Sequence, residues 1–84
     1  MKEPVRFSLS YEQLTGRTEA VIQNYASRLY GTPATNRVCA EAVLMLWCDL
    51  IQEANLEVSD TRLIMEDTRR LLEMVSSIKR TRFD

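Results

Sequence analysis

One stretch constrains this chain more than any other: VCAEAVLMLWCDLI, at residues 38–51. Only Glu41 and Asp49 interrupt its apolar side chains, and the pattern around it predicts a helix over about residues 33–53. A helix that is apolar on nearly every side has to be buried on nearly every side. A chain of 84 residues contains little else to surround it. We therefore expect a second copy of the protein to cover it, in a homodimer or a higher oligomer.

The residues before this stretch predict a first amphipathic helix. Ser10, with Gln13 three residues later, has the spacing of a capping box. Gly16 weakens the first turns by about 1 kcal/mol relative to alanine, so we expect regular helix to begin nearer Thr15 or Thr18. The helical stripe comprises Leu14, Thr18, Val21, Ile22, Tyr25 and Leu29.

A third helix is expected after a polar break at residues 53–60, with Ser59 or Asp60 as its N-cap. Its apolar side comprises Ile64, Leu71, Leu72, Val75 and Ile78. Charged residues fill the opposite side, which is typical of a surface helix with one face against a core.

The N-terminal segment alternates with a period of two, which predicts a short strand over residues 4–10. One face carries Val5, Phe7 and Leu9, and the other carries Arg6, Ser8 and Ser10. A single strand leaves its backbone groups unpaired. We therefore predict a mainly α fold, with one short N-terminal strand and three helices. Two copies would form an intertwined dimer, with their strands paired in a two-stranded antiparallel ribbon.

Composition argues against catalysis and cofactor binding. The chain has no histidine, and the expected function is not enzymatic, with no metal site and no cofactor. Its two cysteines, Cys39 and Cys48, lie nine positions apart in the apolar stretch. They predict buried, reduced thiols in a cytoplasmic protein. No signal peptide or membrane span is expected, since the apolar stretch is too short to cross a bilayer. A net charge of −1 gives no general attraction to polyanions.

Two segments resemble a known family. FSLSY at residues 7–11 and YGTPATNRVCAEAV at residues 30–43 are similar to the strand and the turn into the second helix of ribbon-helix-helix DNA-binding proteins, the Arc and MetJ type. The resemblance implies that residues 1–54 form a dimeric DNA-binding core and that residues 55–84 add a C-terminal helix to the same compact unit. It implies base contacts from Arg6, Ser8 and Ser10, and phosphate contacts from the backbone amides of Thr35 and Asn36.

Two functions follow as hypotheses. The first is a sequence-specific binder of double-stranded DNA, a small transcriptional regulator or a plasmid or phage accessory protein. The alternative is a small helical adaptor or inhibitor that homodimerises and binds another protein instead of DNA, with the C-terminal helix as one candidate contact. The expected dimer interface comprises Val5, Phe7, Leu9, Val38, Val43, Leu46, Trp47 and Leu50.

Overall fold

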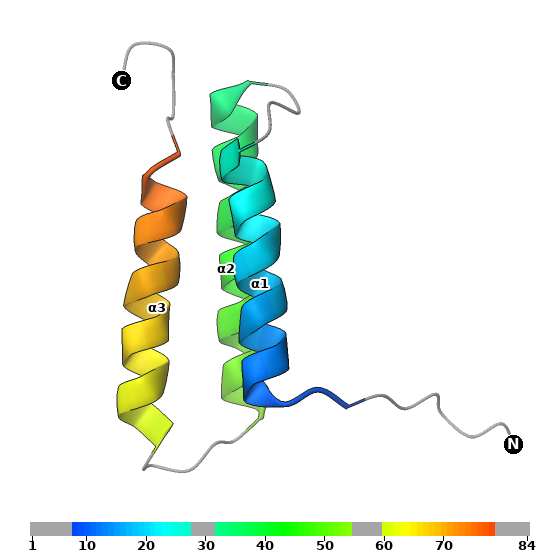
Figure 1. The fold of residues 1–84 in the computed structure, drawn as a ribbon, viewed down its shortest axis with the longest axis vertical. Coiled ribbons are helices and arrows are strands. Elements are labelled where there is room, and N and C mark those ends of the chain that lie inside the picture. The colour runs from blue at the N-terminus through cyan, green and yellow to red at the C-terminus, as the bar shows by residue number, and fades with distance from the viewer. Residues whose placement is uncertain (1–7, 28–31, 55–59, 79–84) are drawn as a thin grey trace, which may run out of the picture.

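The structure, a computed structural model, describes residues 8–27, 32–54 and 60–78. Its helices are α1 (Tyr11–Ser27), α2 (Pro33–Glu53) and α3 (Thr61–Ser76). They lie side by side, and the chain runs up along α1, down along α2 and up again along α3 (Figure 1). Each helix packs against both of the others. The third helix therefore folds onto its own chain.

The predicted start signals of the first two helices are confirmed. The Ser10 amide donates to Gln13 Oε1 at 2.9 Å, and the Gln13 amide donates back to Ser10 Oγ at 3.0 Å. At the start of α2, Thr32 Oγ1 accepts from the Thr35 amide at 3.1 Å, with a proline in the first turn. These bonds satisfy amides that have no partner inside the helix. Asp60 precedes α3, but its side chain makes no capping hydrogen bond.

The expected late start of the first helix is wrong, because α1 begins at Tyr11 instead of near Thr15 or Thr18. The capping box holds the first turn, and Thr15 and Thr18 are both buried against the other helices. These interactions offset the cost of Gly16, whose open side faces no other atom within 4 Å.

The core lies where the three helices meet, and Trp47 is its largest side chain, at 1% exposed. The apolar members are Ile22, Ala40, Leu44, Trp47, Ile51, Leu71, Val75 and Ile78. Most of the predicted third-helix stripe is therefore in or against the core. Leu72 is the exception, since it is 52% exposed on the outer side of α3. Leu29 and Ser59 lie outside the described residues.

The predicted strand and ribbon are wrong for the part of the chain that the structure describes, which contains three helices and no strand. Residues 8–10 lead into α1 without strand pairing, and the backbone of Ser10 is committed to that helix. Its carbonyl accepts from the Leu14 amide at 3.0 Å, and its amide bonds to Gln13. Alternation of side chains does not by itself supply a second strand to which the backbone can bond. Residues 4–7 lie outside the described residues.

Among the described helices, none combines the length and the apolar character that crossing a bilayer requires. Cys39 and Cys48 are free thiols and half-buried, so they are less enclosed than the sequence predicts.

Candidate functional site

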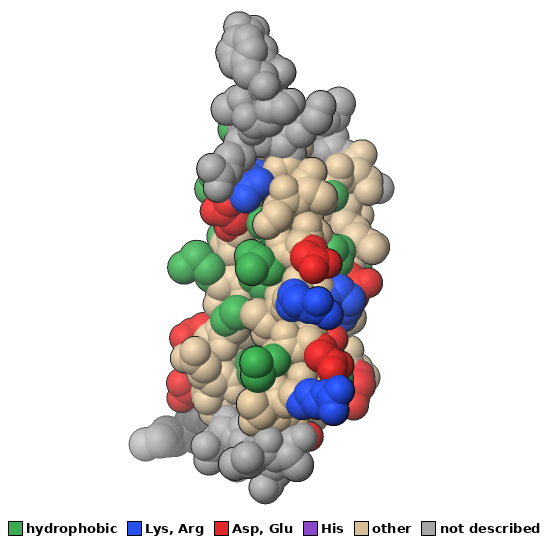
Figure 2. Space-filling view, turned by 90° about the vertical axis from the view of Figure 1, so that its left-hand side faces the viewer, with side chains coloured by type: hydrophobic (Ala, Val, Ile, Leu, Met, Phe, Trp, Pro, Cys, Tyr) green, Lys and Arg blue, Asp and Glu red, His purple; other side chains and the backbone are tan. Residues whose placement is uncertain are grey.

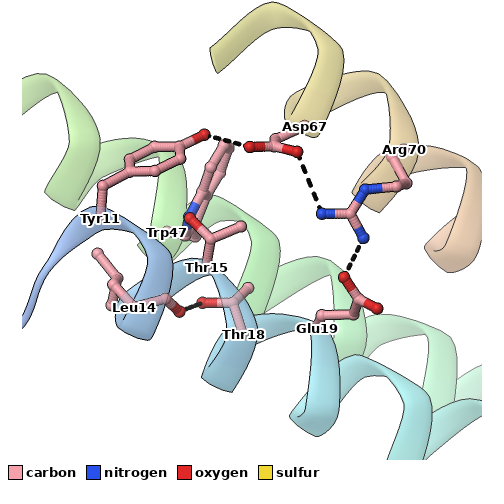
Figure 3. Close-up of polar contacts among 8 residues, drawn as sticks. All are labelled: Tyr11, Leu14, Thr15, Thr18, Glu19, Trp47, Asp67 and Arg70. Carbon is pink, nitrogen blue, oxygen red and sulfur yellow. Dashed lines mark hydrogen bonds and ion pairs between the residues drawn. The ribbon is translucent and has the colours of Figure 1, made fainter. Parts of the chain in front are cut away.

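A polar network joins the first turns of α1 to the middle of α3 (Figure 3). The Tyr11 hydroxyl donates to Asp67 Oδ2 at 2.6 Å, and Arg70 donates to Asp67 Oδ1 at 3.1 Å and to Glu19. Burial, reinforced by the hydrogen bond to Asp67, raises the pKa of Tyr11 to about 12. The phenol therefore stays protonated at neutral pH and cannot act there as a base. The network therefore links α1 to α3.

Trp47 makes the buried contacts with α1 in the same region (Figure 3). Its indole Nε1–H donates to Thr15 Oγ1 at 3.0 Å, and its ring lies 6.4 Å from the Tyr11 ring at 58°. Both partners come from α1, so this contact fixes how α1 and α2 sit against each other. A buried indole usually finds an acceptor in this way.

A different feature lies between α1 and α2, an apolar groove with a volume of about 250 Å³. We call it the α1–α2 groove, and its lining comprises Leu14, Arg17, Thr18, Val21, Val43, Leu46, Trp47 and Leu50. Trp47 and Thr18 are buried there, whereas Leu46 is 59% and Leu50 40% exposed. The groove therefore has an apolar lining with two large side chains that still contact water.

Charged side chains stand at the two rims of the α1–α2 groove. Arg17 belongs to α1 and lines the groove. Asp49 and Glu53 are exposed on α2 and lie three positions after Leu46 and Leu50, so helical spacing places them next to these two leucines, at the outer edge of the groove. None of the three makes an ion pair with another described residue. By contrast, Arg37 pairs with Glu41, and Arg62 pairs with Glu66. The groove thus has a basic rim on α1 and an acidic rim on α2.

The other concave regions have more polar linings. One hollow of about 220 Å³ lies between the start of α1 and the start of α3, beside Glu12 and Asp60. A larger one, of about 420 Å³, lies beside Tyr25 and Cys39, and one of about 360 Å³ lies beside Arg37 on α2. The described residues contain no group of three or more side chains able to hold a metal ion.

Most of the described groups that were predicted to contact DNA make hydrogen bonds within the chain. Ser10 belongs to the capping box of α1, and Ser8 is exposed. The Thr35 amide donates to Thr32 Oγ1, and the Asn36 amide donates to the Thr32 carbonyl at 3.0 Å. A phosphate at this helix start would have to displace the threonine hydroxyl to reach the first of them. Arg6 lies outside the described residues.

The predicted dimer-interface residues fall into two groups. Trp47 is buried inside its own chain, where it packs against α1, and Val43 is half-buried beside it. The others that the structure describes are exposed on a single chain: Leu9, Val38, Leu46 and Leu50. Val5 and Phe7 lie outside the described residues. The apolar surface that α2 exposes is therefore smaller than the sequence indicates. Leu46 and Leu50 are the part of it that borders the groove.

The sequence did not indicate a groove between the first two helices, or a network of Tyr11, Asp67 and Arg70. Leu14 and Val21 belong to the predicted stripe of the first helix, and their spacing of seven matches that of Val43 and Leu50 on α2. That shared spacing is the signal that could have indicated a two-helix groove. Nothing in the sequence pairs Tyr11 with Asp67, since 56 positions separate them.

Comparison of the chain with protein-family models, with curated proteins and with solved structures gives no match. The three-helix fold and the α1–α2 groove are therefore the basis for a functional proposal.

Proposed function

We propose that this protein is a small helical protein–protein interaction module that binds a protein partner through the α1–α2 groove. One observation carries the proposal: an almost wholly apolar groove with Leu46 and Leu50 exposed along its edge. Contiguous apolar surface of this kind, bordered by charge, is characteristic of interaction sites. An amphipathic helix laid in a groove between two helices is a common way to cover it.

The dimensions of the groove favour a macromolecular partner over a small molecule. Its volume of about 250 Å³ is below the roughly 300–1,000 Å³ typical of small-molecule sites. Full burial of a leucine contributes about 1.5–3 kcal/mol, so covering the exposed portions of Leu46 and Leu50 contributes about 1 kcal/mol each. A partner that brings apolar side chains of its own adds to this gain.

This proposal takes the second of the two hypotheses drawn from the sequence. The DNA-binding hypothesis depended on a ribbon, and the described residues contain no strand. Its expected phosphate contacts depended on amides that donate to Thr32 within the chain. The protein-binding hypothesis needs neither of these features.

Photocrosslinking in the host cell tests the proposal. Benzoylphenylalanine at position 46 should yield covalent adducts with a protein, because that side chain borders the groove. The same group at position 72 is the matched control, since Leu72 is 52% exposed on α3. We expect protein adducts from position 46 and few from position 72. Equal yields at the two positions, or adducts with nucleic acid alone, would contradict the proposed function.

A further inference from the structure

We propose that the α1–α2 groove is occupied by the same groove of a second copy. The two chains would face each other across a two-fold axis parallel to the helices, so that α1 of each copy lies against α2 of the other. This inference rests on the proposed function and names the partner that the groove binds. It is carried by the shape of the groove and by the charges on its rims.

The apolar side chains of the α1–α2 groove can be covered by the same side chains of a second copy. Leu46 and Leu50 stand exposed on the α2 side, whereas the α1 side contributes the half-buried Leu14 and Val21. A two-fold axis along the helices brings the exposed leucines of each copy over the α1 side of the other. Both sets of apolar side chains are then covered at once, and the contact is isologous, as in most homodimers.

The charges on the rims favour this axis over its alternative. With the axis along the helices, the α1 rim of one copy lies over the α2 rim of the other, and Arg17 meets the side that carries Asp49 and Glu53. With the axis perpendicular to the helices, each helix would lie over its own counterpart, and acidic rim would meet acidic rim. Opposite charges across an interface favour association, and like charges oppose it. The first arrangement is therefore preferred.

The heights of Arg17 and Asp49 along the helices agree with that arrangement, whereas Glu53 lies about one turn further away. The hydrogen bond from Trp47 to Thr15 places these two residues at the same level of the antiparallel helices. Counting from there at 1.5 Å per residue, Arg17 lies about one helical turn from the level of Asp49. A two-fold axis along the helices preserves these levels in the second copy. An arginine side chain can span that separation.

The outer face of α3 offers a less suitable surface for self-association. Figure 2 shows acidic and basic side chains next to one another along this face, with hydrophobic side chains beside them. Arg62 pairs with Glu66 there, and Arg70 pairs with Glu19 and Asp67. Much of the charge on this face is therefore already paired, although Arg69 and Glu73 make no ion pair with another described residue.

Sedimentation equilibrium of the full chain, at micromolar concentration, tests the pairing. We expect the unmodified protein to have twice the mass of one chain. Leu46→Glu should weaken the dimer by at least about 100-fold, because each copy would place a carboxylate in apolar surroundings. Leu72→Glu, the same change at similar exposure on α3, should leave the dimer intact. Circular dichroism of both variants checks that they remain helical.

Charge reversal tests the orientation. Arg17→Glu alone, or Asp49→Arg alone, should weaken the dimer by a few-fold, and the two together should restore it. A monomeric unmodified protein, a dimer indifferent to Leu46→Glu, or no restoration by the double reversal would overturn this inference. If the protein is monomeric but the crosslinker at position 46 captures a different protein, self-pairing fails and the proposed function stands. If no protein is captured, both fail.

Discussion

The hydrogen bond between Trp47 and Thr15 should be worth a measurable part of the protein's stability. Thr15→Val removes the acceptor with little change in shape, and it leaves the indole N–H, on a side chain 1% exposed, without its partner. An unsatisfied buried donor costs about 1–3 kcal/mol. At about 0.05–0.15 kcal/mol per residue, this 84-residue chain has only about 4–13 kcal/mol in total. Loss of the bond should therefore lower the urea midpoint clearly.

Two comparisons isolate the bond. Thr18→Val removes a hydroxyl that is also buried but only donates to the Leu14 carbonyl, at 2.9 Å, so it should cost less. In a Trp47→Phe background the indole donor is gone, and Thr15→Val should cost little there. Urea unfolding followed by circular dichroism gives all these values. A cost for Thr15→Val no larger than that for Thr18→Val, or one unchanged in the Trp47→Phe background, would refute the reasoning.

Two further predictions concern α1. Ser10→Ala should lower the free energy of unfolding by about 1 kcal/mol, because the amide of Gln13 loses its acceptor; an unchanged urea midpoint would argue against the capping box. Tyr11 should titrate with a pKa of about 12 in the folded protein against an ordinary value of 10.0, so its contribution to stability should be constant below pH 10 and be lost as the pH rises toward 12. Tyrosinate absorbance should lose this late step in Tyr11→Phe, and a late step that persists would assign it to another tyrosine.

Local signals predicted much of the fold. The bounds of α2, the capping box at Ser10 and the cap at Thr32 all follow from side chains within a few positions of the bonds they make. Such interactions are readable because they depend on sequence spacing alone. The ribbon was wrong because alternation describes which way side chains would face and does not show that a second strand is present.

Contacts between distant segments could not be predicted in the same way. Tyr11 meets Asp67, and Thr15 meets Trp47, only because the helices pack at a particular rotation about their axes. The apolar stretch of α2 predicted burial on nearly every side, whereas within the single chain Val38, Met45, Leu46 and Leu50 are exposed. It could not divide that burial between the two other helices of the same chain and a second chain. The division places Trp47 inside and leaves Leu46 exposed.

The central claim is that the α1–α2 groove of one chain is covered by that of another. An NMR experiment on a mixture of isotope-labelled and unlabelled chains, filtered for intermolecular contacts, tests it most directly. We predict contacts from the Leu46 methyl groups of one copy to the methyl groups of Leu14 or Val21 of the other. Intermolecular contacts confined to Leu72 and its neighbours on α3, or none at all at concentrations where the chain is otherwise folded, would contradict the claim.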